Sequence, residues 1–217
     1  MPSNNDAMNT SAEMSAPTLA RLCQAAINIL VALLFGLLVM SAYHHFAATG
    51  SSRFLGIFVI NFMFFGLFIT RRSAKAESDS LPLWLLAVAG TACPLLLRPS
   101  DAAGFMVVGS VIQIVGIVLI ACGLSSLRRS FAVVPGNRGI RDGGLYRIVR
   151  HPLYFSELVA LLGAVLVNPS VANWTIWLCE CGLQYARARA EENFLSSDPA
   201  YRAYRERVRY RLIPGLI

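Results

Sequence analysis

The sequence predicts an all-α, polytopic transmembrane bundle of five to six helices that ends in a helical hairpin. Composition is the first reason: of 217 residues, 56% are hydrophobic and only 14% are charged, a balance typical of integral membrane proteins. Patterning is the second, because the apolar residues gather in long runs, most of them roughly long enough to cross about 30 Å of hydrocarbon as helices.

The N-terminal half is predicted to hold a tail and four membrane spans. Residues 1–20 are rich in Ser, Asn, Ala and Met without apolar periodicity, so we expect a disordered tail. The first apolar run lacks a basic n-region and a cleavage site, which favours a retained span over a signal peptide. Within residues 21–127 we expect four spans, at residues 22–43, 54–70, 81–97 and 103–124. The third of them contains Pro94.

The last apolar region, residues 153–185, is predicted to form the helical hairpin of a core that covers residues 128–217. Asn168, Pro169 and Ser170 interrupt it, a combination that stops one helix and caps the next. Both apolar arms are short for membrane spans, so the sequence leaves open whether the hairpin crosses the bilayer once, twice or only in part.

The formal charge of +7 is explained by membrane orientation. With the N-terminus in the cytoplasm, 17 of the Lys and Arg residues fall in inside segments, and only Arg53 and Arg98 face outward. No aromatic platform is interleaved with the basic residues, which argues against a nucleic-acid surface. We therefore expect the chemistry at the cytoplasmic face.

The cysteines indicate neither a disulfide framework nor a metal site. All five lie inside apolar stretches, and no paired zinc motif can be drawn from them. Cys179 and Cys181 are two residues apart, so on a helix they point in nearly opposite directions. We expect free thiols and no bound metal.

Polar residues concentrate in the loop 128–152 and in the tail 180–211. In the tail, Glu180, Gln184, Arg187 and Glu191 recur at spacings of four, three and four, which aligns them on one helix face. That face points into a polar cavity or, as the alternative, into solvent. Glu157 and Glu180 fall inside the apolar hairpin, where an ionised carboxylate costs roughly 2.5 kcal/mol or more, so they are expected to face the interior or to pair structurally.

Two sequence blocks resemble the isoprenylcysteine carboxyl methyltransferase family. The first is the run from Gly144 to Tyr154, which contains the Arg150-His151-Pro152 tripeptide. The second begins with Arg-Ala-Arg-Ala-Glu-Glu at 187–192 and ends with Val-Arg-Tyr-Arg-Leu-Ile-Pro-Gly at 208–215. The resemblance covers roughly residues 128–215, whereas the first 100 residues contribute only a pattern of spans. Ser156 and Asp198-Pro199 depart from the family's usual residues.

The resemblance implies a membrane methyltransferase without a Rossmann domain, whose cofactor pocket for S-adenosylmethionine lies at the cytosolic face. No Gly-x-Gly-x-x-Gly follows a predicted strand, which agrees with this. By the same resemblance, Arg187 would lie on the side of the molecule that receives the methyl group. That acceptor would be lipophilic, for example a prenylcysteine-like carboxylate. Carried over by position, the donor-binding residues would be Arg138, Gly139, Ile140, Arg141, Tyr146, His151, Pro152, Leu153, Tyr154 and Glu191.

The candidate catalytic residues are Arg187, Glu157 and Glu180. Methyl transfer needs the acceptor held in line about 3 to 3.5 Å from the methyl carbon, so positioning supplies most of the rate. A carboxylate acceptor needs no strong base, but an amine, phenol or thiol does, and Glu157 or Glu180 is then the candidate. Two other interpretations stay open: a nicotinamide-dependent reductase of the sterol type, which has a similar Arg-His-Pro signature, and a non-catalytic membrane scaffold.

Overall fold

The structure, a computed structural model, is helical over most of the residues that it describes. These are residues 76–77, 80–98, 100, 102–127, 136–137 and 142–216, with short helical runs and single residues between 29 and 62. The predicted tail, most of the first two predicted spans, and the loop residues Arg138, Gly139, Ile140 and Arg141 lie outside the described residues.

The C-terminal hairpin was predicted correctly. Helix α5 (Pro152–Val167) and helix α6 (Val171–Leu195) are antiparallel neighbours joined by the Asn168-Pro169-Ser170 turn. Ser170 caps α6, because its side-chain oxygen accepts a hydrogen bond from the backbone N–H of Asn173 at 3.0 Å. The side-chain amide of Asn173 also donates, from Nδ2, to the backbone carbonyl oxygen of Asn168 at 2.7 Å, which fixes the turn.

The third predicted span is shorter than expected. Helix α3 (Leu81–Ala92) ends before Pro94 and continues only as the 3-10 turn η2 (Cys93–Leu96). Proline lacks the N–H that an α-helix needs and clashes with the preceding turn, which explains the early end. The fourth predicted span is helix α4 (Met106–Leu127), three residues later in the sequence than expected.

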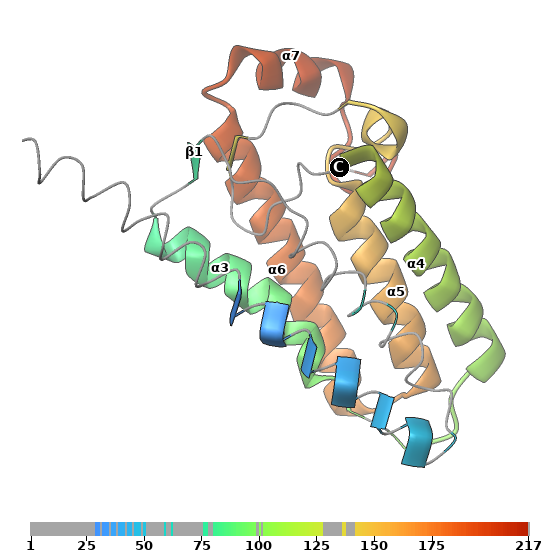
Figure 1. Ribbon diagram of the computed structural model, residues 1–217. Coiled ribbons are helices and arrows are strands. Elements are labelled where there is room, and N and C mark those ends of the chain that lie inside the picture. Colours follow the sequence, from blue (N-terminus) through green and yellow to red (C-terminus); the bar gives the residue numbers. More distant parts are fainter. Residues whose placement is uncertain are drawn as a thin grey trace, which may run out of the picture.

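Four helices lie side by side in the order α3, α6, α5 and α4 (Figure 1). Helix α7 (Pro199–Arg207) and the 3-10 turn η4 (Gly144–Arg147) lie at one end of this layer, beside the C-terminal end of α6 and the N-terminal end of α5 (Figure 1). We call this end of the bundle the polar end. A two-residue antiparallel ladder between β1 (Ala76–Glu77) and β2 (Gly136–Asn137) was not predicted.

Helices α4 and α5 pack closely through small residues. The buried face of α4 carries Gly109, Gly116 and Gly123 at seven-residue intervals. A Cβ atom on Gly116 would overlap the backbone of Ala160, and one on Gly163 would overlap the backbone of α4. Such contacts let two helix backbones approach without intervening side chains, as in helix pairs within membranes.

The opposite face of α4 is apolar and exposed. Val107, Val111, Ile114 and Val118 recur along it, and Val107 is 77% exposed. Among the described residues, α4 is the one helix that is both long and apolar enough to cross a membrane. Its 22 residues span about 33 Å at about 1.5 Å per residue, slightly more than the hydrocarbon thickness of about 30 Å.

We predict that Gly116→Ala lowers the thermal unfolding midpoint of the detergent-solubilised protein. The added methyl group would force α4 away from Ala160, and such overpacking costs about 1–3 kcal/mol. Gly182→Ala is the matched control, because Gly182 also lies within a helix but a Cβ there meets no atom within 4 Å. That variant should be neutral or slightly more stable. Equal midpoints for the two variants would contradict the close packing.

Candidate functional site

The two motif blocks meet at the polar end. Val149 forms a parallel bridge with Tyr210, and the backbone N–H groups of Arg150 and His151 donate to the carbonyl oxygens of Tyr210 and Arg211, each at 2.9 Å. The hydroxyl of Tyr204, on α7, donates to the carbonyl oxygen of Tyr146 at 2.8 Å. The C-terminal segment is therefore held directly against the Arg-His-Pro segment.

A buried carboxylate, Glu192, joins these segments to α6. Its Oε1 accepts from Nε of Arg150 at 2.7 Å, and its Oε2 accepts from Nη2 of Arg211 at 2.9 Å. Nε2 of His151 lies 3.3 Å from the same Oε1. Arg150 also donates from Nη1 to the carbonyl oxygen of Val208 at 2.8 Å, so one guanidinium links the end of α6 to the C-terminal segment.

Electrostatics favour the ionised form of Glu192. Burial alone would raise the pKa of this carboxyl group, but hydrogen bonds from His151, Arg211 and Arg150 outweigh burial and hold the pKa well below its usual range. The Glu192 side chain is only 3% exposed. A carboxylate so enclosed serves to hold the site together and is not free to bind a ligand.

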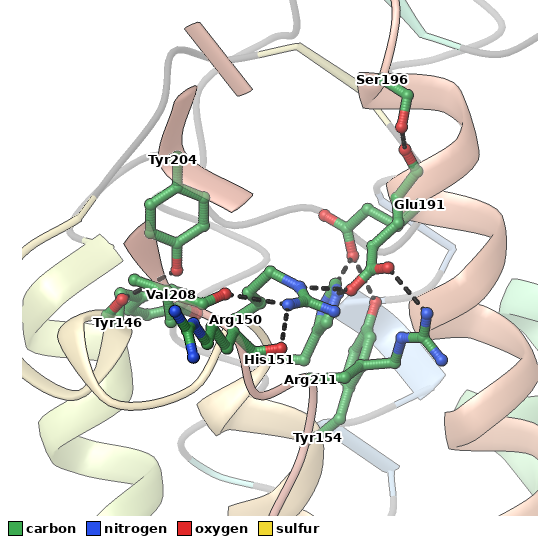
Figure 2. Close-up of polar contacts among 11 residues, drawn as sticks. Tyr146, Arg150, His151, Tyr154, Glu191, Ser196, Tyr204, Val208 and Arg211 are labelled. Carbon is green, nitrogen blue, oxygen red and sulfur yellow. Dashed lines mark hydrogen bonds and ion pairs between the residues drawn. The ribbon is translucent and has the colours of Figure 1, made fainter. Parts of the chain in front are cut away.

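Its neighbour Glu191 is the accessible carboxylate. The Glu191 side chain is 27% exposed, and its Oε2 accepts a hydrogen bond from the hydroxyl of Tyr154 at 3.0 Å (Figure 2). Nδ1 of His151 lies 3.6 Å from the same oxygen. The rings of His151 and Tyr154 are parallel, with centroids 5.4 Å apart. Pro152 begins α5 directly after His151, so the start of this helix fixes the positions of both rings.

Tyr154 also marks the beginning of a second polar group deeper in the hairpin. The guanidinium carbon of Arg187 lies 4.8 Å from the centre of the Tyr154 ring, within the range of a cation–π contact. Nη1 of Arg187 donates to Oε1 of Gln184 at 3.2 Å. Arg187 packs so closely over α3 that a Cβ on Gly90 would come within 2.6 Å of its Cδ.

Gln184 connects the two carboxylates that lie within the apolar hairpin. Its Nε2 donates to Oε2 of Glu157 at 2.7 Å and to Oε1 of Glu180 at 2.6 Å. Gln184 and Glu180 are fully buried, whereas Glu157 is only partly buried. We call Glu157, Glu180, Gln184 and Arg187 the hairpin cluster.

The structure brings most of the predicted site residues together. Four residues do lie along one face of α6: Glu180, Gln184, Arg187 and Glu191. The first three are buried against α5 and α3, whereas Glu191, at the polar end, is partly exposed. Leu153 lies against Gly123 of α4, on the other side of α5 from these contacts. Among the described residues no group of His, Cys, Asp and Glu could hold a metal ion.

Sequence reasoning missed the role of Arg150, Glu192 and Arg211. All three were present in the motif blocks, but no function was assigned to them. A usable signal was there: Glu192 follows Glu191 directly, so on a helix it points about 100° away and needs a partner of its own. The arginine-rich C-terminal segment was the available source of that partner.

Comparison with known families places the chain. Residues 78–208 match a family described as a protein of unknown function, DUF1295, and the match includes all the candidate site residues. A comparison with curated proteins gives no match. The family description carries no activity, so the resemblance to isoprenylcysteine carboxyl methyltransferases stays a prediction. Because the match covers more than half of the 217 residues, the chain belongs to the DUF1295 family.

Proposed function

We propose that this chain is an integral membrane methyltransferase that transfers a methyl group from S-adenosylmethionine to a lipophilic acceptor. The observation that carries the proposal is the 3.0 Å hydrogen bond between Tyr154 and Glu191, which joins the two motif blocks that resemble such enzymes. The same Tyr154 ring contacts Arg187 on its face, so one aromatic side chain links the accessible carboxylate to the hairpin cluster.

The Glu191 carboxylate is suited to bind groups that donate hydrogen bonds, such as hydroxyl and ammonium groups. A carboxylate accepts hydrogen bonds from both, and S-adenosylmethionine carries both in its ribose and its amino acid portion. When bound, it supplies a methyl group activated by a positively charged sulfur. The Glu191 side chain is the partly exposed acceptor at the polar end, next to His151 and Tyr154, which supports donor binding there.

The same carboxylate disfavours a phosphate-rich nicotinamide cofactor. Phosphates require cationic partners, and in the part of the chain that the structure describes Arg150 and Arg211 of the polar end are already bonded to Glu192. The partly exposed carboxylate of Glu191, which is next to Glu192 in the sequence, repels further negative charge. This observation favours the methyl donor over the reductase interpretation.

The acceptor is proposed to lie along α6, farther from the polar end than the donor. Glu180 is about 16 Å farther along the α6 axis than Glu191, at about 1.5 Å per residue. The polar face of α6 between them is enclosed by α5 and α3, and the exposed face of α4 is apolar. A membrane orientation with the polar end in the cytoplasm agrees with the excess of Lys and Arg in the segments assigned inside.

The proposal is tested by incubating the protein in lipid nanodiscs with methyl-labelled S-adenosylmethionine and extracted lipids. We expect label in a lipid product. Arg187→Ala should lower turnover by about 100-fold, because the loss of a positioning group misplaces the acceptor, while donor affinity is unchanged. Arg189→Ala, at an exposed position on the same helix, should retain turnover.

A thermal unfolding scan of Arg187→Ala accompanies this assay, since Arg187 is buried. The proposal is rejected if no lipid gains label, or if the Arg187 and Arg189 variants retain equal turnover. Oxidation of NADPH in place of methyl transfer would support the reductase interpretation. Binding of neither cofactor would support the scaffold interpretation.

A further inference from the structure

The charges of the hairpin cluster do not balance. Its two carboxylates, Glu157 and Glu180, lie in an apolar hairpin. Among the described residues, Arg187 is the positively charged side chain that attracts both of them electrostatically. Gln184 donates one amide hydrogen to each carboxylate but brings no charge. With both carboxylates ionised, the cluster therefore lacks one positive charge, and an uncompensated charge in such surroundings is costly.

A second, independent observation is an oxygen atom without a partner. Glu180 is 0% exposed, and among the described residues its Oε2 has no hydrogen-bond partner. The thiol of Cys93 also interacts with Glu180, but by distance and angle its hydrogen bond goes to the carbonyl oxygen of Ile176 at 3.7 Å. A buried carboxylate oxygen that accepts no hydrogen bond is expensive, so this position is suited to a donor from a ligand.

We infer that the reacting group of the acceptor is a protonatable amine on a lipid chain, bound between Glu180 and Glu157; this rests on the proposed function. An ammonium group supplies both missing features, a positive charge and N–H donors. A carboxylate acceptor would instead place a third negative charge beside two others, which is strongly unfavourable. Glu157 is the partly buried member of the cluster, so the amine would enter from its side.

The same arrangement provides the base that N-methylation requires. The bound ammonium loses one proton to Oε2 of Glu180 and becomes a neutral amine. Its nitrogen lone pair then forms the new N–C bond while the C–S bond of the donor breaks, and the sulfur keeps that electron pair. Glu180 acts as the base, and Gln184 and Arg187 hold the cluster in place.

Binding without any methyl donor tests the inference. The probes are octadecylamine, octadecanoate and the short-chain butylamine, each titrated calorimetrically into the full-length protein in zwitterionic nanodiscs, with empty nanodiscs subtracted. We expect octadecylamine to bind at least about tenfold more tightly than octadecanoate, because like charges are excluded. Butylamine should bind weakly, since it lacks the chain. Equal binding of butylamine would overturn the lipid part of the inference.

The variants Glu180→Gln and Glu157→Gln remove one charge each and nearly keep the side-chain shape. Each should weaken octadecylamine binding about tenfold, and each should reduce the ratio of the affinity for octadecylamine to the affinity for octadecanoate. Glu206→Gln, at an exposed position on α7, should leave both unchanged. The amine inference is overturned if octadecanoate binds as tightly as octadecylamine, or if both cluster variants keep the wild-type preference while thermal unfolding shows them folded.

A separate titration with S-adenosylmethionine distinguishes failure of the proposed methyl transfer from failure of the inferred amine site. Amine preference without binding of S-adenosylmethionine would reject the proposed methyl transfer but retain the amine site. Binding of S-adenosylmethionine without amine preference would retain the methyltransferase proposal and reject the amine acceptor.

Discussion

Replacement of Glu192 by alanine is expected to lower the free energy of unfolding by about 3–5 kcal/mol, because it leaves two buried guanidinium groups without their carboxylate. Arg150 and Arg211 bond to opposite oxygens of Glu192, and all three side chains are largely buried. The effect is measured by equilibrium unfolding in mixed detergent micelles. Glu206→Ala, at an exposed position on α7, should change the free energy by no more than about 0.5 kcal/mol.

The contribution of Glu192 should also depend on pH in one direction. Burial raises the pKa of Glu192, but the hydrogen bonds from His151, Arg211 and Arg150 lower it more, so the folded value is below the unperturbed 4.5. The stability from this group is therefore fully present above about pH 4.5 and is lost as the pH falls toward the folded pKa. The stability difference between wild type and Glu192→Gln should shrink on acidification. A difference that grows below pH 4.5 would contradict the network.

Glu191→Ala and His151→Ala are each expected to weaken S-adenosylmethionine binding by about tenfold or more. Glu191 supplies the accessible carboxylate at the polar end, and His151 lies beside it with Nδ1 at 3.6 Å from Oε2. Loss of a charge-assisted hydrogen bond is worth about 1.5–3 kcal/mol, which corresponds to about tenfold or more in affinity. Isothermal titration of each purified variant gives the comparison.

Two variants serve as references for that titration. Arg187→Ala should keep donor affinity, since Arg187 belongs to the hairpin cluster, where the acceptor is proposed to bind, and donates to Gln184 there. Arg189→Ala, at an exposed position, should keep both affinity and turnover. Equal donor affinity in the Glu191, His151 and Arg187 variants would remove the support for a donor site at Glu191.

The hairpin and the polar face of α6 were predictable from sequence because both depend on local rules. Asn168, Pro169 and Ser170 carry the stop and cap signals within three residues, and the spacing from Glu180 to Glu191 follows helical periodicity. The early end of α3 was also locally encoded, since Pro94 lies inside the predicted span. The predicted span followed the length of the apolar run, which continues past Pro94, whereas the α-helix ends before this proline.

The partners of Glu192 and Gln184 could not be predicted in this way. Arg150 and Glu192 are 42 residues apart, and Glu157 and Gln184 are 27 apart. Such pairs depend on how helices approach one another in three dimensions, and no local pattern specifies that approach. The close contact of α4 with α5 at Gly116 and Ala160 has the same origin: glycine permits it, but the partner helix is a property of the fold.

The central claim is that the polar end binds a sulfonium-bearing nucleoside, S-adenosylmethionine. Calorimetry on the wild-type protein, with S-adenosylmethionine, S-adenosylhomocysteine and NADPH titrated separately, measures this directly. The account predicts saturable binding of the first two ligands and none of NADPH. Affinity for NADPH together with none for either adenosyl compound would contradict it.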